Sequence, residues 1–257
     1  KINADQIFED PEKYYDSRKG QTDKYYNMSG GFIQNFSFDP NGFKIDKNYL
    51  NQLDDIHQWS LYVSREALKD SGYLNKTDML NRCGIVLGNL SFPTKTSNHL
   101  CLPIYHDSLQ NQINAKFPTS DITFHNKTNH QVHLDNLRMG GYPAMLVRQA
   151  LGLSNIAFSL DAACATSLYA MKLAIDYLET GKADIMLAGA VSAADPFFIN
   201  AGFSIFQAYS DQGLSCPLDK RTGGLTAGEG AGMVLLKKYT TAVQDGDKIY
   251  GVIEGIG

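Results

Sequence analysis

The chain has 257 residues and 43% of them are hydrophobic, which is enough to bury a substantial core without disulfide bonds. Charged residues make up only 19%, the formal net charge is −4 and no basic run occurs, so the composition excludes a typical nucleic-acid-binding surface. No apolar run reaches the roughly 18 residues that span a bilayer, so neither nucleic acid nor a membrane is expected as a partner.

The N-terminal sequence and the cysteines both indicate a reducing compartment. The first ten residues, KINADQIFED, hold no apolar segment and no cleavage site, so they do not resemble a signal peptide. The four cysteines are widely spaced and form no CxxC pair: Cys83, Cys101, Cys164 and Cys216. We therefore expect a cytoplasmic location.

One helix stands out near the N-terminus. Residues 1–45 are polar and aromatic, and they predict an irregular surface segment with short helices at most. In residues 50–71, apolar side chains such as Trp59 and Leu68 fall close to one face at a period of 3.6 residues. This pattern predicts a helix that begins at Asn51 or Asp54 and that Gly72 ends.

A long irregular connection is predicted in the middle of the chain. It follows residues 82–90, a short β-branched run that predicts a buried strand. Residues 91–135 are rich in Asn, Thr, Ser and His, and prolines interrupt them at Pro93, Pro103 and Pro118. A connection of this length is usually functional or mobile. A helical pattern returns at residues 137–151 and ends at Gly152.

The second half of the chain is more regular. Short apolar runs predict strands at residues 155–161, 183–191, 230–237 and 249–256. A helical pattern occupies residues 165–180 and ends at Gly181. The strand at 183–191 is apolar throughout, which is typical of burial on both faces. Together these elements predict an α/β layered fold with a largely buried mixed sheet.

Cys164 has the setting of a nucleophile. It lies in a tight turn between a strand that ends near Asp161 and a helix that begins near Ala165, and the small side chains of Ala162 and Ala163 leave the sulfur accessible. The unpaired N–H groups and the positive end of the helix dipole favour a thiolate and lower the pKa of such a thiol. The same N–H groups can stabilise an oxyanion on an attacked thioester carbonyl.

A simpler interpretation of Cys164 stays open at this point. Free cysteine is among the most buried residue types, so Cys164 could be a small hydrophobic side chain at a crowded turn. A reactive cysteine needs an accessible, electropositive site, which the spacing alone does not establish. The other three cysteines lack this strand–turn–helix context and are expected to be structural or incidental.

Several segments match one protein family in the family's own order. DAACATSLYA, residues 161–170, resembles the active-site motif of β-ketoacyl synthases, a DxACxSSL-type sequence that carries the acylated cysteine. Residues 53–72 resemble the family's early helix, and residues 216–238 resemble its segment that ends in GEGAG. The resemblance runs from about Tyr14 to the C-terminus. It is closer to polyketide and polyunsaturated-fatty-acid synthases than to the stand-alone enzymes.

This resemblance implies a fold and a reaction. The fold is thiolase-like, with two similar α/β halves packed in layers, and this chain is similar to the N-terminal half, a mixed five-stranded-type sheet flanked by helices. Cys164 would take an acyl group from the phosphopantetheine of an acyl carrier protein. A malonyl-type extender would then lose carbon dioxide, and the resulting carbanion would attack the acyl-enzyme. No cofactor is expected on the chain itself, and a homodimer is expected because family members commonly dimerise.

The resemblance also implies that part of the family's domain lies outside this sequence. Residues 1–257 correspond to the N-terminal half, without the family's first strand and without its C-terminal half. The two histidines and the lysine that support decarboxylation belong to that second half of the family's domain. We therefore expect this chain alone to accept an acyl group but not to catalyse condensation.

Phe203 is the candidate substrate-binding residue. It belongs to FFINAGFSIFQAYS, residues 197–210, whose many aromatic side chains are also explained by core packing alone. By resemblance, AGFSIFQAYS lines the acyl pocket of the family. We therefore expect Phe203 to lie near Cys164 and to contact the acyl chain.

The glycine-rich segment 223–232 does not fit a phosphate-binding loop. It lacks the GK[ST] ending, and it precedes a predicted strand rather than a helix. Its glycines are expected to permit close backbone packing, and Glu229 to be a buried, hydrogen-bonded structural carboxylate.

The histidines do not predict a metal site. His125, His130 and His133 lie close together, but HNKTNHQVH is loop-like and carboxylate or cysteine partners at ligand spacing are not obvious nearby. A polar surface loop without metal is expected there. His57 belongs to the early helix, where we expect it to be solvated or hydrogen-bonded.

Two functions of other classes remain open. The chain could be a catalytically incomplete assembly or dimerisation module, with the strand at residues 183–191 as its paired edge. Alternatively, Cys164 could serve a Cys–His hydrolase, which requires a histidine within hydrogen-bond reach of the sulfur.

Overall fold

A computed structural model describes residues 11–124, 132–210 and 215–256. The chain forms two compact units, each made of two stretches of sequence. The first unit combines Lys1–Phe36 with Ala193–Gly230, and the second combines Ser37–Ser192 with Ala231–Gly257.

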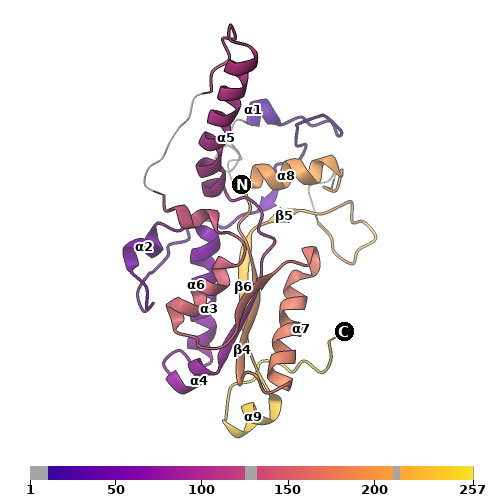
Figure 1. Cartoon of the computed structure of the whole chain (residues 1–257). Coiled ribbons are helices and arrows are strands. Elements are labelled where there is room, and N and C mark those ends of the chain that lie inside the picture. The colour runs from indigo at the N-terminus through magenta and orange to yellow at the C-terminus, as the bar shows by residue number, and fades with distance from the viewer. Residues whose placement is uncertain (1–10, 125–131, 211–214, 257) are drawn as a thin grey trace. The chain divides into compact units, whose positions relative to one another are not determined.

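The second unit contains the main sheet and most of the helices (Figure 1). Its strands are β2 (Cys83–Gly88), β3 (Ala157–Leu160), β4 (Ile185–Ser192) and β6 (Gly230–Lys237). The first residue of β6, Gly230, is the last residue of the first unit. Its α-helices are α2 (Lys47–Asn51), α3 (Asp55–Asp70), α4 (Thr77–Asn81), α5 (Lys95–Lys116), α6 (Tyr142–Leu151), α7 (Thr166–Glu179) and α9 (Tyr239–Gln244). Two short 3₁₀ helices complete it, η2 (Leu134–Leu137) and η3 (Ala163–Ala165).

The strands of this sheet lie in the order β3-β2-β4-β6. Strand β2 pairs in parallel with both β3 and β4, and its last residue, Gly88, lies between Leu160 of β3 and Ala190 of β4. The carboxyl ends of these three strands therefore meet at one edge of the sheet.

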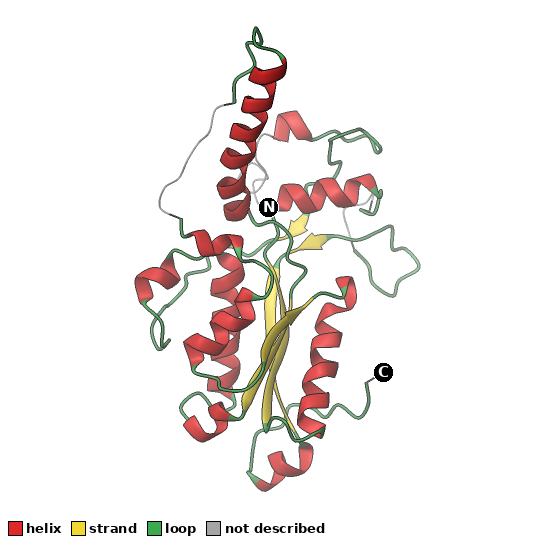
Figure 2. Cartoon of the chain, in the orientation of Figure 1, coloured by secondary structure: helices red, strands yellow, loops and turns green. Residues whose placement is uncertain are grey.

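Helices cover both faces of the sheet (Figure 2). Helices α3 and α6 pack together on one face, and α7 packs against β2 and β4 on the other. All of β2 and most of β4 are buried. This confirms the prediction of two-sided burial for the apolar run at residues 183–191.

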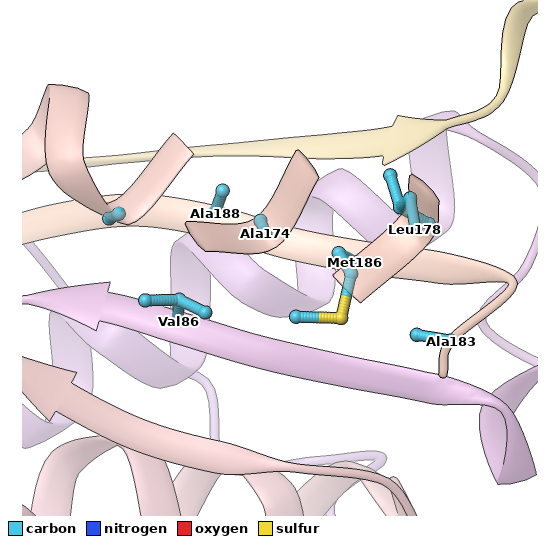
Figure 3. Close-up of a cluster of buried hydrophobic side chains, with 7 residues drawn as sticks. Val86, Ala174, Leu178, Ala183, Met186 and Ala188 are labelled. Carbon is cyan, nitrogen blue, oxygen red and sulfur yellow. The ribbon is translucent and has the colours of Figure 1, made fainter. Parts of the chain in front are cut away.

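The packing of α7 depends on small side chains (Figure 3). Ala170 and Ala174 lie one turn apart on α7, are fully buried, and belong to a hydrophobic cluster with Val86, Met186 and Ala188 of the sheet. Alanine at these positions lets the helix backbone approach the sheet closely, and this places the N-terminus of α7 beside the carboxyl ends of the strands.

Of the two predicted starts for the helix in residues 50–71, Asp54 is confirmed as the N-cap of α3, whereas Asn51 ends the separate helix α2 because the chain turns at residues 52–54. Asp46 caps α2 by accepting the N–H of Tyr49. The predicted helix ends are confirmed: Gly72, Gly152 and Gly181 follow α3, α6 and α7 with φ values of +74°, +71° and +70°.

The prediction of a long irregular connection at residues 91–135 is wrong over its first half, where α5 spans 22 residues. Thr94 and Ser97 form a reciprocal capping box that starts this helix, and Pro103 is accommodated within it. The apolar residues of α5 follow no 3.6-residue period, and Leu102, Ile104 and Tyr105 are exposed. Apolar periodicity therefore gave no signal for this helix.

The strand predicted at residues 249–256 is also wrong, because this segment has no regular secondary structure. Its apolar side chains are largely exposed; Tyr250, for example, is 73% exposed and its hydroxyl bonds to Asp70. Strand propensity reflects the fit of side chains to a half-buried pleated surface, and this segment has no such surface.

The first unit is small and is organised around tyrosines. Its elements are α1 (Pro11–Tyr14), β1 (Gly30–Gly31), α8 (Pro196–Ile205) and β5 (Ala227–Gly228), and β1 pairs in parallel with β5. Tyr25 and Tyr209 are fully buried. The Tyr26 hydroxyl donates to the carbonyl of Tyr209 at 3.1 Å, and Asn200 donates to the carbonyl of Asn27 at 2.7 Å.

The layered α/β class is confirmed, with four strands in the described part of the main sheet. One prediction about its edges is wrong: residues 183–191 form β4, which lies between β2 and β6 and is not an edge strand. Strands β3 and β6 occupy the edges instead. Among the helices of the described residues, none combines the length and the apolar character needed to cross a bilayer.

Candidate functional site

Cys164 lies just beyond the carboxyl end of β3, within η3, where the chain turns into α7. Since β2, β3 and β4 are parallel and in register at this end, the turn is located at the edge where three strands finish. Open α/β sheets bind their ligands outside the carboxyl ends of their strands. The predicted strand–turn–helix setting of Cys164 is therefore confirmed.

Three side-chain hydrogen bonds hold the turn. Asp161 Oδ1 accepts the N–H of Ala163 at 2.8 Å, and Thr166 Oγ1 accepts the N–H of Ala162 at 2.9 Å. The Thr166 hydroxyl also donates to the carbonyl of Ala163 at 2.5 Å. Ala163, immediately before Cys164, has a φ of +50°, which is uncommon for a residue with a Cβ. The hydrogen bonds thus maintain a strained backbone next to the cysteine.

Cys164 is exposed, so the interpretation of this residue as a buried hydrophobic side chain is wrong. The helix that follows has 14 residues, and its N-cap, Ala165, offers no side chain to its first N–H groups. These groups and the helix dipole supply positive potential near the sulfur. The first turn of α7 contains no acidic residue that would oppose it.

The other cysteines lie in different surroundings. Cys83 is fully buried at the start of β2, and burial raises the pKa of its thiol to about 12. A thiol with this pKa is protonated at neutral pH and is a poor nucleophile. Cys101 is exposed on α5, and Cys216 is half-buried in the first unit.

Asp161 and Thr166 belong to the candidate site, although no motif in the sequence singled them out. Asp161 bonds the N–H two residues later, a pattern by which aspartate often forms turns. A threonine at the first position of a helix also bonds nearby backbone groups readily. An aspartate and a threonine that flank residues 162–165 are therefore a sequence signal for a side-chain-capped turn at Cys164.

The histidines do not contact Cys164 within the described residues. His125 and His130 lie outside those residues, His99 and His106 lie on α5, and His133 caps η2. The Cys164 thiol forms no hydrogen bond with any described histidine. Across residues 11–124, 132–210 and 215–256, no group of three or more His, Cys, Asp or Glu side chains is placed to hold a metal ion.

The prediction that His57 is solvated or hydrogen-bonded is wrong. His57 is fully buried on α3, and neither ring nitrogen has a hydrogen-bond partner among the residues that the structure describes. Its ring packs edge-on against Tyr142, with the centroids 5.6 Å apart. Burial lowers the pKa of His57 to about 4, so the ring is neutral at physiological pH.

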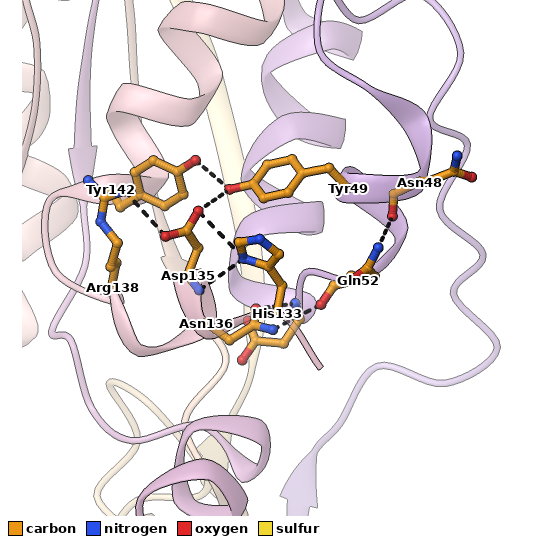
Figure 4. A network of polar contacts seen from close by, with 9 residues as sticks. Asn48, Tyr49, Gln52, His133, Asp135, Asn136, Arg138 and Tyr142 are labelled. Carbon is orange, nitrogen blue, oxygen red and sulfur yellow. Dashed lines mark hydrogen bonds and ion pairs between the residues drawn. The ribbon is translucent and has the colours of Figure 1, made fainter. Parts of the chain in front are cut away.

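A polar network joins α2, η2 and the start of α6 (Figure 4). The Tyr49 hydroxyl donates to Asp135 at 2.7 Å and is 2.5 Å from the Tyr142 hydroxyl. Asn136, fully buried, accepts the N–H of Asp54 and donates to the carbonyl of Gln52. The network ties η2 and the start of α6 to the segment between α2 and α3, and it forms part of the scaffold of the unit.

One open cavity of about 490 Å³ lies beside the edge strand β3. Its lining includes Arg138, Tyr142 and Met145, together with Ala157 and Ser159 of β3. Cys164 does not line it. The cavity is therefore a feature separate from the turn that holds the sulfur.

Phe203 and Glu229 belong to the first unit. Phe203 lies on α8, half-buried, and packs edge-on against Tyr209 at 6.1 Å between centroids. Its contact with an acyl chain near Cys164 stays a prediction, since Cys164 belongs to the second unit. Glu229 accepts the N–H of Ile33 at 2.8 Å, so its predicted hydrogen-bonded role is confirmed, although the residue is half-buried rather than buried.

Comparison with known proteins gives one family. The family model described as "Beta-ketoacyl synthase, N-terminal domain" matches residues 2–242. Polyunsaturated fatty acid synthase subunits B and A of Thraustochytrium sp. (strain ATCC 26185 / S-3) are 38% identical to the chain over 209 residues and 30% identical over 250 residues. These matches include 80% and 94% of this chain but only 10% and 9% of the two relatives.

Solved structures agree with this result. The structure of "PfaC Keto synthase-Chain length factor" is 52% identical, with a TM-score of 0.87, and the match covers 97% of this chain and 27% of that chain. The oxazolomycin ketosynthase domain OzmH KS7 of Streptomyces albus JA3453 is 21% identical, with a TM-score of 0.71. It matches 96% of this chain and 39% of its own length, and at this identity it supports the fold alone.

Proposed function

Because the chain belongs to the β-ketoacyl synthase family, we propose that it is the acyl-accepting part of a ketosynthase domain for polyketide or fatty-acid synthesis. The observation that carries this proposal is the exposed Cys164 in a strained turn between β3 and the N-terminus of α7. In sequence this turn also matches the family's active-site motif.

The first proposed step is transfer of an acyl group to Cys164. The thiolate attacks the carbonyl carbon of an acyl thioester on the phosphopantetheine of an acyl carrier protein. An oxyanion forms on the carbonyl oxygen, and the backbone N–H groups of the turn stabilise it by donating hydrogen bonds. The pantetheine sulfur then leaves as a thiolate and takes a proton, and the acyl group stays on Cys164 as a thioester.

The second proposed step is decarboxylative condensation. A malonyl-type thioester loses carbon dioxide, and the resulting carbanion attacks the carbonyl of acyl-Cys164. A carbon–carbon bond forms, the Cys164 thiolate leaves, and a β-ketoacyl thioester is released. By family resemblance, the histidines and the lysine for decarboxylation come from the C-terminal half of the domain, so residues 1–257 alone accept an acyl group without condensing it.

Phe203 is proposed to contact the acyl chain. The support is the resemblance of AGFSIFQAYS to the family's acyl-pocket segment and the half-buried aromatic ring on α8. Phe203→Ala in a complete synthase should change the distribution of product chain lengths, because it enlarges the space available to the acyl chain. An unchanged chain-length profile by mass spectrometry would remove this assignment.

The function is tested by product analysis after the chain is expressed together with the C-terminal half of its domain. With an acyl thioester and a malonyl thioester, the wild-type pair should form the β-ketoacyl product, and Cys164→Ala should abolish it. Cys101→Ala, which removes the exposed cysteine of α5, serves as the control and should leave the product unchanged. Product formation by Cys164→Ala would contradict the proposal.

An assembly module is the second candidate function. Two observations favour it: β3 is an edge strand in the described sheet, and the PfaC relative pairs a keto synthase with a chain length factor by its printed name. We expect a homodimer, which mass measurement in solution separates from a monomer. Since a dimer is compatible with both functions, the Cys164→Ala result decides between them.

The proposed compartment is the cytoplasm. All four cysteines are free, which is typical of proteins in a reducing environment.

A further inference from the structure

The hydroxyl of Thr166 bridges the two residues that precede Cys164. It accepts the N–H of Ala162 at 2.9 Å and donates to the carbonyl of Ala163 at 2.5 Å. Thr166 is only 3% exposed, so both hydrogen bonds are shielded from water. The backbone N–H of Thr166 also bonds to the Ala163 carbonyl.

The Ala163 carbonyl belongs to the peptide group that joins Ala163 to Cys164. In a planar trans peptide the C=O and the N–H point in opposite directions, so a bond that holds the carbonyl also sets the direction of the Cys164 N–H. Ala163 has a φ of +50°, a conformation that persists only when surrounding contacts enforce it. Thr166 provides two such contacts from one side chain.

We propose that Thr166 is a positioning residue for acyl transfer. Its hydroxyl orients the peptide before Cys164, so that the Cys164 N–H is held ready to donate to the oxyanion of the attacked thioester. Thr166 acts through the backbone and needs no contact with the substrate. This inference rests on the proposed function of Cys164.

Gly88 makes room for the Thr166 side chain. A Cβ atom at Gly88 would lie 2.6 Å from Thr166 Cγ2 and 3.1 Å from the Cβ of Ala190. Because non-bonded carbon atoms pack at about 3.5–4.0 Å, Gly88→Ala has to displace the Thr166 methyl group. The absence of a side chain at Gly88, the last residue of β2, thus leaves the space that the Thr166 methyl group occupies.

The test compares two reactions of Cys164 in the wild-type chain and in Thr166 variants. Acylation by an acyl-pantetheine thioester passes through an oxyanion, whereas alkylation by iodoacetamide reports only the access and nucleophilicity of the sulfur. Thr166→Val should lower the ratio of the acylation rate to the alkylation rate about tenfold, because a displaced oxyanion donor costs transition-state stabilisation. Thr166→Ser keeps the hydroxyl and should restore the ratio.

Thr94→Val is the matched control. Thr94 is also buried, and its hydroxyl likewise accepts a backbone N–H, from Ser97 at 3.1 Å, and donates to an oxygen, of Asp54 at 2.6 Å. This variant should leave the ratio at the wild-type value. The proposal is overturned if Thr166→Val keeps the wild-type ratio, if both reactions slow equally, or if Thr94→Val changes the ratio as much.

Gly88→Ala decides the question if Thr166→Val does not fold. This variant retains the hydroxyl but shifts it, so it should also lower the ratio. The decrease should become smaller when Gly88→Ala is combined with Thr166→Ser, which lacks the obstructing methyl group; simply additive effects would overturn the proposal. A folded wild-type chain that forms no acyl-Cys164 contradicts the proposed function itself, an outcome distinct from all of these.

Discussion

Cys83 and Cys164 place the same functional group in opposite surroundings. Cys83 is enclosed at the start of β2, where burial raises its pKa to about 12, whereas Cys164 is exposed at the start of α7. A buried thiol with so high a pKa stays protonated at neutral pH and is a poor nucleophile, whereas the sulfur of Cys164 is accessible. The hydrogen bonds from Asp161 and Thr166 then set the backbone that carries it.

His57 should make stability depend on pH. Its folded pKa of about 4 lies below the ordinary value of 6.5, because burial disfavours the charged ring. Between these values the unfolded chain binds a proton that the folded chain does not, so the His57 contribution is complete above pH 6.5 and is lost as the pH falls towards 4. As the pH rises from 4 to 6.5, the free energy of unfolding of the wild-type protein should increase by about 1–3 kcal/mol relative to that of His57→Leu. Urea unfolding at each pH measures this difference.

Asp54 provides the control, since its effect has the opposite sign. Burial raises the pKa of Asp54 to about 6 from 3.8, so the folded chain binds the extra proton and its stability decreases as the pH rises through this range. The free energy of unfolding of Asp54→Asn should therefore increase relative to that of the wild-type protein over the same pH range. If His57→Leu and the wild-type protein keep a constant difference between pH 4 and 6.5, the buried neutral state of His57 is contradicted.

At the scale of elements, side-chain hydrogen bonds tie the short helix η2, which precedes α6, to the segment between α2 and α3. The amide of Asn136 accepts the N–H of Asp54 at 2.8 Å. It also donates to the carbonyl of Gln52 at 2.9 Å (Figure 4). Asn136→Ala should lower the free energy of unfolding by about 1–3 kcal/mol, since two backbone groups lose their partner. Chemical denaturation measures this directly.

Asn48→Ala is the matched control for Asn136. Asn48 is exposed on α2, and removal of its side chain should change the free energy of unfolding by less than about 0.5 kcal/mol. Equal losses in the two variants would show that the Asn136 hydrogen bonds do not stabilise this segment.

The close approach of α7 to the sheet should be sensitive to volume. Ala174 is fully buried against the cluster of Val86, Met186 and Ala188, so Ala174→Leu forces larger atoms into a filled space. Overpacking of this kind should cost about 1–3 kcal/mol in thermal or chemical unfolding. Ala115→Leu, at an exposed position of α5, should change stability by less than about 0.5 kcal/mol. A tolerated Ala174→Leu would mean that α7 packs loosely.

For the whole molecule, apolar runs predicted the main sheet well. Strands β2, β3, β4 and β6 were identified from short continuous apolar segments, the pattern that is typical of the largely buried strands β2 and β4. The run at residues 249–256 has the same composition but no neighbouring strand to pair with among the described residues. Composition alone does not distinguish these two cases.

Helix α5 and the details of the turn could not be predicted in the same way. Helix α5 begins with the capping box of Thr94 and Ser97, and its exposed apolar residues lack the usual period. The strand–turn–helix setting of Cys164 was predicted from the sequence, but the positive φ of Ala163 and the bridge from Thr166 arise only when the strand ends and α7 are brought together. Tertiary contacts, rather than local propensity, determine these features.

The most direct test of the account is the intact mass and peptide map of the chain after incubation with an acyl-pantetheine thioester. Wild-type protein and Cys101→Ala should each gain a single acyl group, on the peptide that contains Cys164, and Cys164→Ala should gain none. Acylation that persists in Cys164→Ala, or a folded wild-type chain that takes up no acyl group, would contradict the assignment of Cys164 as the nucleophile.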